Sequence, residues 1–396
     1  MDRRVWRVLA LVAASITLFG VSTIEAQERG VTPGEVVFGS SMPLSGPAAY
    51  WGGVGKGMDA YVRYLNDQGG IHGRKLRFVL QDDSYLPPRA VVNVRELVER
   101  FGVFAIVGTI GTANNFAIRD YIIASKVLWI SPGADSSMWA GFRQKRYLFV
   151  TTFAYVHEAA TLTRYATEKL GVKSVSVFYQ NDLYGAKGLL GVKRAASALK
   201  GKVKLASAIP FEVTDTDVSS HALKLRGSEA DAVVLYATPR HAALLVREMA
   251  KIGYRPRLLA SLTLVDPIMF TLAGEAWDEV YQTTWFPLPG HDPKVDETLQ
   301  ILIKYDPALR ANPYNALGGV AWLEPFLEGL RRAGRDLTAD RFVSAMETIR
   351  NWDGQVMRGV TFGPDRRQGT NRFYIVRAEK GRYLKLSDWI EYPVEF

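Results

Sequence analysis

Residues 43–52, with the sequence PLSGPAAYWG, form a polar and aromatic segment between a strand pattern and a helix pattern. The preceding residues 35–40 are largely apolar and β-branched, which predicts a buried strand. After the segment, apolar residues recur at helical spacing until Gly69 and Gly70; they are Val54, Met58, Tyr61, Val62 and Leu65. In an open α/β sheet, ligands bind in loops that follow a strand and precede a helix. We therefore expect residues 43–52 to contribute to a ligand site.

The same alternation continues along the first part of the chain. The pattern predicts strands over 75–80, 105–107 and 127–130, and helices over 89–101 and 114–125. Short connections between them indicate a parallel sheet covered by helices on both faces. A second series begins at residue 174, with strands over 174–179, 204–208, 232–236 and 257–261 and a helix over 184–199. This second series predicts a second α/β lobe.

The last third of the chain is expected to serve both lobes. A strand over 279–285 leads back to the first lobe, which helices over 294–305 and 315–332 complete. Short strands over 355–361, 371–377 and 383–386 are assigned mostly to the second lobe. The predicted fold class is therefore α/β, with two doubly wound lobes and several crossings that make a hinge. The predicted boundaries are 27–151 plus 284–352 for the N-terminal lobe, and 152–283 plus 353–396 for the C-terminal lobe.

The N-terminus has the three-part layout of a secretory signal peptide over residues 1–26. Arg3, Arg4 and Arg7 precede an uncharged apolar run over 8–21 and a polar stretch that ends at Ala26. The run is shorter than the roughly 20 apolar residues that span a bilayer, which argues against a membrane anchor. The chain contains no cysteine, so it can have neither a disulfide nor a lipid attached to a cysteine. We expect an exported protein that is not lipid-anchored.

Net charge does not indicate a nucleic-acid partner. The formal charge is +9, and removal of the signal, with three arginines against Asp2 and Glu25, would leave +8. Basic residues are interspersed with acidic ones, as in the sequence RELVER over 95–100, so we expect a solvated basic surface. Such a surface can help to attract anionic solutes.

Motifs of catalysis and of cofactor binding are absent or incomplete. The sequence GKGMDA over 55–60 fits a dinucleotide fingerprint, but it lies more than a dozen residues beyond its strand, so close helix packing by small residues explains it better. His157 and Glu158 lack the second histidine of a zinc protease motif. The five histidines show no ligand spacing and are expected at the surface or in helix caps. The sequence therefore predicts no enzyme, no metal and no cofactor.

Two segments, PLSGPAAYWG over 43–52 and NDQGGIHGRKLRFVLQDD over 66–83, resemble the periplasmic solute-binding proteins of branched-chain amino-acid type ABC transporters. The resemblance runs from about residue 36 to about residue 283. It implies the type I periplasmic binding protein fold, in which a three-segment hinge joins the two lobes. It also implies a monomer that binds a small carboxylate ligand and delivers it to ABC transporter permease subunits.

Candidate ligand-binding residues follow the predicted strands. Glycines and hydroxyls over 108–114 and 131–136 suit close backbone approach and hydrogen bonds to a carboxylate. By resemblance, Thr112 holds the ligand carboxylate, the Gly133 carbonyl faces an amino group, and Asp135 replaces a usual threonine. Resemblance or position at a strand end adds Tyr50, Trp51, Ala134, Tyr155, Tyr184, Thr238 and Leu262. Thr112 and Asp135 could instead cap helices, and Tyr184 could only pack.

One departure from the family pattern bears on the ligand. Amino-acid binders of the family hold the ligand ammonium with an acidic residue of the second lobe, at a place that falls near Leu262-Thr263-Leu264 here. A buried ammonium without a charge partner is costly, so this loss disfavours amino acids unless Asp135 replaces the missing group. The aromatic residues suit an aromatic or aliphatic organic acid. A sensor of the same fold, which signals to a regulator without transport, is the alternative function.

Overall fold

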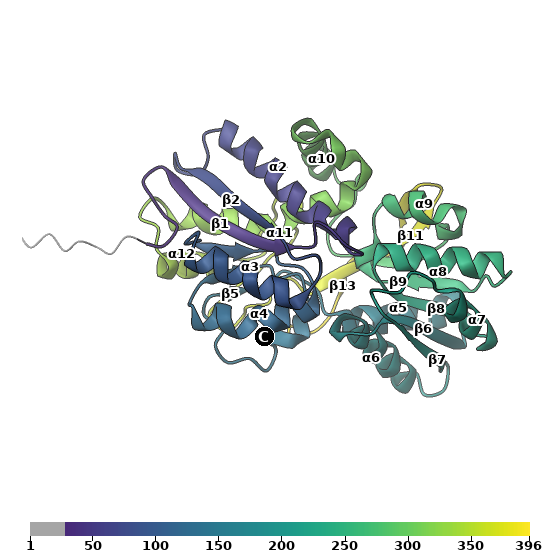
Figure 1. Ribbon diagram of the computed structural model, residues 1–396. Coiled ribbons are helices and arrows are strands. Elements are labelled where there is room, and N and C mark those ends of the chain that lie inside the picture. Colours follow the sequence, from purple (N-terminus) through teal and green to yellow (C-terminus); the bar gives the residue numbers. More distant parts are fainter. Residues whose placement is uncertain (1–27) are drawn as a thin grey trace, which may run out of the picture.

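Two lobes lie side by side in the structure, a computed structural model that describes residues 28–396 (Figure 1). The predicted signal peptide over 1–26 lies outside the described residues. Within 28–396, no helix is both long enough and apolar enough to cross a membrane. The chain passes between the lobes three times: after β5 (Leu148–Phe149), after β10 (Tyr281–Thr284) and before β11 (Arg372–Glu379). The prediction of two α/β lobes joined by a three-segment hinge is confirmed.

The first lobe is built on a parallel sheet with the strand order β2-β1-β3-β4-β5. Its other strands are β1 (Glu35–Met42), β2 (Lys75–Asp82), β3 (Ala105–Val107) and β4 (Leu128–Ile130). Successive residues of β1 contact opposite layers: Val37 packs with Leu97 of α3 (Pro87–Glu99), and Phe38 with Phe326 of α11 (Pro313–Ala333). The remaining helices are α2 (Gly53–Asp67), α4 (Thr112–Ala124), α10 (Pro293–Tyr305) and α12 (Ala339–Met346).

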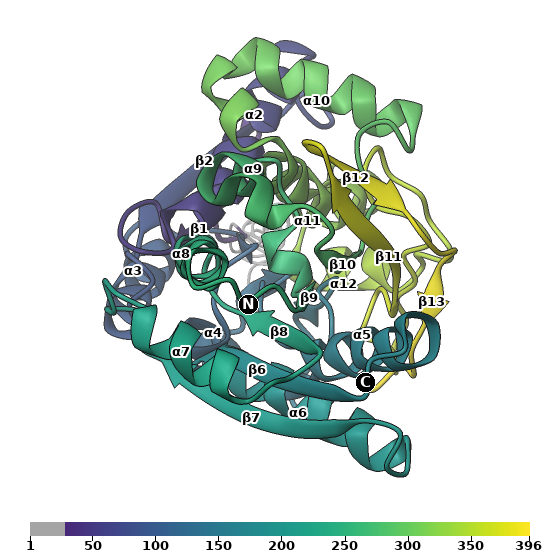
Figure 2. The same cartoon turned by 90° about the vertical axis from the view of Figure 1, so that its right-hand side faces the viewer.

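The second lobe has a mixed sheet with the strand order β12-β11-β10-β9-β8-β6-β7, and β13 pairs with β11. Figure 2 shows this lobe end-on, with β7 at one edge and the β11–β12 hairpin at the other. The strands are β6 (Ser174–Gln180), β7 (Lys204–Phe211), β8 (Ala232–Tyr236), β9 (Arg257–Ala260), β12 (Arg382–Lys385) and β13 (Ile390–Glu391). Its helices are α5 (Tyr155–Leu170), α6 (Leu183–Ala198), α7 (Ser219–Gly227), α8 (Pro239–Lys251) and α9 (Ile268–Ala273).

The described residues also form short 3-10 turns, and one close helix contact lies within the first lobe. The turns are η1 (Ala49–Gly52), η2 (Ser136–Trp139), η3 (Leu262–Leu264), η4 (Gly274–Trp277) and η5 (Pro307–Ala311). In α2, a Cβ atom on Gly57 would lie 2.2 Å from the carbonyl oxygen of Ala316 in α11. The prediction that the GKGMDA sequence serves close helix packing is therefore confirmed, and this contact holds α11 against α2.

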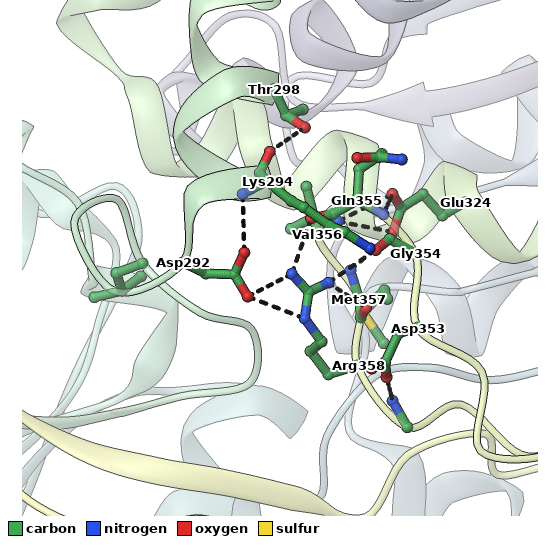
Figure 3. Close-up of polar contacts among 12 residues, drawn as sticks. Asp292, Lys294, Thr298, Glu324, Asp353, Gly354, Gln355, Val356, Met357 and Arg358 are labelled. Atoms are coloured by element: carbon green, nitrogen blue, oxygen red, sulfur yellow. Dashed lines mark hydrogen bonds and ion pairs between the residues drawn. The ribbon is translucent and has the colours of Figure 1, made fainter.

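The strand predicted over 355–361 is wrong, because the backbone there binds a buried carboxylate. Figure 3 shows Glu324 of α11 accepting hydrogen bonds from the amides of Gln355 at 2.5 Å, Val356 at 3.0 Å and Met357 at 2.8 Å. Three successive amides that turn toward one group cannot alternate as they do in a strand. Arg358 pairs with Asp292 at 2.5 Å beside them. These bonds attach residues 355–357 to the first lobe, whereas the predicted boundary at residue 353 assigns them to the second.

Candidate functional site

A cavity of about 690 Å³, which includes space open to solvent, lies between the two lobes. It collects the carboxyl ends of strands from both sheets, as expected for open α/β folds. The first lobe contributes loops after β1, β2, β3 and β4 and one face of α11, and the second contributes the starts of α5 and α6 and the loops after β9 and β10. Its lining residues include Trp51, Thr112, Tyr184, Thr263, Trp285, Gly318 and Trp322.

The lining of this cavity is aromatic and uncharged. Tryptophan, tyrosine and phenylalanine side chains make up nearly half of its lining residues, and within residues 28–396 no aspartate, glutamate, lysine, arginine or histidine is among them. Burial raises the pKa values of Tyr155 and Tyr184, so both phenols stay neutral and act only through hydrogen bonds and ring contacts. A ligand in this cavity therefore meets partial charges and apolar surface.

The N-terminus of α4 lies at the cavity and has no side-chain cap among the described residues. The first amides of a helix have no partner within the helix, and they carry the positive end of the helix dipole. Thr112 is the first residue of α4, and its Oγ1 accepts a hydrogen bond from the amide of Asp135 at 3.2 Å. That contact uses an oxygen lone pair, so the hydroxyl hydrogen of Thr112 can still donate to a ligand. This arrangement suits a carboxylate.

Aromatic rings form a continuous wall across both lobes. Trp51 of η1 contacts Tyr85 and Tyr184 edge-on, with ring centroids 5.4 Å and 6.0 Å apart. The ring centroids of Tyr184 and Tyr155 are 4.9 Å apart. The ring of Phe153 contacts that of Tyr155 and also that of Trp285, whose centroid lies 5.5 Å away. Such edge-to-face contacts add to the energy of apolar burial. The wall favours a flat or apolar ligand body.

Hydrogen bonds join the lobes directly at the cavity. Trp51 of the first lobe donates its Nε1 hydrogen to the carbonyl oxygen of Thr263 in the second, at 2.9 Å. The Thr263 hydroxyl lies 2.7 Å from the Tyr184 hydroxyl. Lys187 of α6 donates to the Ser137 hydroxyl of the first lobe at 2.9 Å. The structure is therefore a closed form, in which opening the hinge would break the Trp51–Thr263 and Lys187–Ser137 bonds.

The structure brings six of the ten predicted site residues to the cavity. They are Trp51, Thr112, Gly133, Tyr155, Tyr184 and Leu262. Their contact with a ligand stays a prediction. Tyr50 is not in the lining and uses its carbonyl to accept a hydrogen bond from Asn312, while Ala134 is buried in the loop after β4. Thr238 caps α8, where its hydroxyl lies 2.7 Å from His241 Nδ1.

Asp135 faces away from the lining, so it does not supply the missing ammonium partner in this closed form. Its carboxylate accepts hydrogen bonds from the amide of Tyr155 at 2.9 Å and from the Ser137 hydroxyl, and Lys187 Nζ lies 3.5 Å away. Burial raises its pKa, and these three partners oppose that effect. Asp135 therefore organises the junction of β4 and α5.

Other sequence predictions concern histidines and metals. His241 is fully buried, its backbone amide donates to the N-cap residue Thr238 of α8, and its ring Nε2 donates to the Asp215 carbonyl, so it lies in a helix cap as expected. Within residues 28–396, no group of three histidine, aspartate or glutamate side chains is arranged to hold a metal.

Sequence reasoning did not identify the contribution of α11 and of the loops after β2 and β10. The missed lining residues include Tyr85, Thr263, Trp285, Tyr314, Asn315, Gly318 and Trp322. Trp285 has a usable signal, because it is the last residue of the strand predicted over 279–285. The residues of α11 have none, since almost every residue of that helix is buried and cavity-facing positions cannot be told from core positions by periodicity.

Glu158 of α5 accepts a hydrogen bond from Leu262, a lining residue of the cavity, and its protonation makes the stability of the fold depend on pH. Burial raises its pKa to about 7, although four hydrogen bonds lower it. The folded protein then keeps this proton up to pH 7, whereas the unfolded chain loses it near pH 4.5. Stability should therefore fall as the pH rises through this window, by about 3 kcal/mol for this group.

The measurement is chemical denaturation of wild type and Glu158→Gln between pH 4.5 and 8. Because Asp266 and Glu324 also have pKa values raised to about 7, the difference between the two proteins isolates Glu158. We expect that difference to shrink as the pH rises. A difference that is constant with pH would contradict the prediction.

The chain is similar to periplasmic binding proteins in both sequence and fold. A family model described as periplasmic binding protein matches residues 35–382. Leu/Ile/Val-binding protein homolog 1 from Brucella abortus (strain 2308) is 24% identical over 277 residues, which cover 68% of this chain and 71% of that protein.

Two solved structures are similar over nearly their whole length. The fatty acid ABC transporter substrate-binding protein from Thermomonospora curvata has a TM-score of 0.82 and 23% identity, with 93% of this chain and 96% of that chain covered. An ABC transporter solute binding protein from R. palustris, in complex with 4-hydroxybenzoate, has a TM-score of 0.79 and 18% identity, with 90% and 97% covered. At these identities the likeness is one of fold.

Proposed function

Since this chain belongs to the periplasmic binding protein family, of the leucine-binding-like ABC transporter type, we propose that it captures a small organic acid between its lobes for uptake. Family membership confirms the resemblance seen in residues 43–83 and implies an extracytoplasmic location. The family consists of solute-binding proteins, and the proposed role is binding without catalysis. The proposed partners are permease subunits of an ABC transporter, and the proposed export signal is residues 1–26.

One observation carries the choice of ligand: a helix N-terminus, that of α4, lies at a cavity in whose lining no residue of 28–396 has a charged side chain. Thr112 and the α4 amides can hold a carboxylate. An ammonium group in the same cavity would lose its hydration without gaining a carboxylate partner, which is costly. The aromatic wall then supports an apolar or aromatic body. An aromatic or aliphatic monocarboxylate is favoured over an amino acid.

Thermal stability of the purified protein against three ligand sets tests this proposal. A ligand that binds only the folded state raises the unfolding midpoint by mass action. We expect benzoates or aliphatic acids to raise it, and leucine, isoleucine and valine to leave it nearly unchanged. A shift with the amino acids alone would overturn the proposed ligand class. Conversion of a bound acid into another compound would overturn the non-enzymatic role.

Thr112→Ala should weaken binding of the best acid by about 1–3 kcal/mol, which is about 5- to 150-fold. The physical reason is the loss of a hydroxyl donor at the positive end of α4. Titration calorimetry measures the change. Thr338→Ala serves as a control, because Thr338 caps α12 away from the cavity. Unchanged affinity in Thr112→Ala would show that the carboxylate is held elsewhere.

A further inference from the structure

Gly318 occupies an unusual place in the middle of α11. Glycine destabilises a helix interior relative to alanine, so a buried helical glycine usually has a packing reason. Its neighbour Gly319 has one: a Cβ atom there would lie 2.1 Å from the carbonyl oxygen of Val54 in α2. At Gly318, the nearest atoms to an added Cβ would be Trp285 Cζ2 at 3.9 Å and Phe286 Cε1 at 4.0 Å. These are ordinary contact distances, so packing does not require this glycine.

Gly318 lines the cavity, and this position explains why the helix has a glycine there. Tyr314, Gly318 and Trp322 are four residues apart along α11, so they lie on one face of the helix, and all three line the cavity. The absence of a side chain at Gly318 leaves room in front of the Trp285 and Phe286 rings. A methyl group there would take part of that room without disturbing the fold.

Trp322, one turn further along the same face, provides a hydrogen-bond donor. Its side chain is 6% exposed, and within residues 28–396 its Nε1 hydrogen has no hydrogen-bond partner. Its Cζ3 and Cη2 atoms lie closest to Gly133, and Cε3 to Gly108. The six-membered ring therefore packs against the loops after β3 and β4, and Nε1 lies on the opposite side of the indole. A buried donor without a partner is rare in proteins, and a ligand acceptor would satisfy it.

We propose that Gly318 and Trp322 form a specificity subsite that selects carboxylic acids with a ring-sized body and a second oxygen acceptor. This inference rests on the proposed binding of an organic acid. Thr112 and the α4 amides hold the carboxylate, so the indole Nε1–H serves a hydroxyl, carbonyl or ether oxygen elsewhere on the ligand. Gly318 makes the space in which the ring lies against Trp285 and Phe286.

Calorimetric titration of wild type, Gly318→Ala and Trp322→Phe with propionate, benzoate and the three hydroxybenzoates tests the subsite. For Gly318→Ala we expect at least a 10-fold loss of affinity for the benzoates, no loss for propionate, and an unfolding midpoint raised by a few degrees. Gly319→Ala is the matched control, and its midpoint should fall because of the contact with Val54.

For Trp322→Phe the readout is the ratio of affinities for the preferred hydroxybenzoate and benzoate. We expect a preference of about 10-fold in wild type to fall to near unity, since the phenyl ring keeps an apolar contact but has no N–H. Equal losses for both ligands would overturn the donor role, because they would reflect packing alone. Full affinity for benzoates in Gly318→Ala, or a lowered midpoint, would overturn the role of the glycine.

These outcomes separate the subsite from the function on which it rests. Binding of acids by wild type that neither substitution alters would overturn the subsite and leave the proposed function intact. Failure of wild type to bind any of the acids would overturn both.

Discussion

Glu158→Ala should lower the free energy of unfolding by on the order of 4 kcal/mol near pH 5. The Glu158 carboxyl group is fully buried and is a shared partner of four groups. It accepts from the Tyr236 hydroxyl at 2.7 Å, the Leu262 amide at 2.5 Å, the Thr283 hydroxyl at 3.0 Å and the Ser261 hydroxyl at 3.3 Å. Alanine would leave these buried polar groups without their partner and would open a void next to Leu262, which lines the interlobe cavity.

Chemical denaturation checks this effect against a control on the same helix. Thr163 of α5 is also buried, but its hydroxyl donates to the Ala159 carbonyl of its own helix, so Thr163→Ala leaves no distant group unpaired. We expect the control to lose much less stability than Glu158→Ala. The loss of unfolding free energy in Glu158→Ala should also be smaller at pH 8, because there the buried carboxyl group of wild type is ionised and wild type itself is less stable. Equal losses in the two variants would contradict the prediction.

Asp266→Ala should weaken binding of the best acid on the order of 100-fold, through the hinge and not through ligand contact. Asp266 follows β9 in the second lobe, and one of its carboxylate oxygens accepts from the amides of Tyr314 at 2.8 Å and Asn315 at 2.9 Å. Those amides begin α11 of the first lobe, so the carboxylate caps that helix only when the lobes are closed. Alanine would leave both amides unpaired in the closed form and thus favour the open form.

Affinity and stability must be measured together for this variant. Thr338 accepts from the amide of Arg341 at 3.2 Å and caps α12 within the first lobe alone. Thr338→Ala should lower stability by about 1 kcal/mol and leave ligand affinity unchanged. Asp266→Ala should lower affinity, and Asp266→Asn, which keeps one acceptor oxygen, should lower it less. An affinity of Asp266→Ala within twofold of wild type would show that this bond does not stabilise closure.

Local pattern predicts most of the regular structure of this chain. The strands expected over 105–107 and 232–236 have those bounds in the structure. Short β-branched runs between glycine-rich or polar loops favour a strand over any other local structure. The strand expected over 355–361 fails for the opposite reason. Its apolar residues fit a strand pattern, but the backbone amides of residues 355–357 donate hydrogen bonds to Glu324, about thirty positions earlier, and so cannot pair with a neighbouring strand.

Some residues of the candidate site could likewise be predicted from the sequence, and others could not. Trp51, Thr112 and Tyr184 could be singled out because each lies where a predicted strand gives way to a helix, and that position is readable from neighbouring residues. Gly318 and Trp322 could not, because their helix is buried on nearly every side. Asp135 has the residue type and position of a ligand partner, yet its carboxylate turns to Tyr155, Ser137 and Lys187.

The sequence by itself determined the two α/β lobes, their order of strands and helices, and loops that line the cavity between the lobes. These depend on hydrophobic periodicity and on turn residues, which act over a few positions. Only the tertiary structure decided which side chains meet in the cavity and that none of its lining residues within 28–396 is charged. The hydrogen bond from Trp51 to Thr263 joins residues 212 positions apart, and its existence depends on how the two lobes close. Such contacts are set by the packing of whole lobes, which no local pattern encodes.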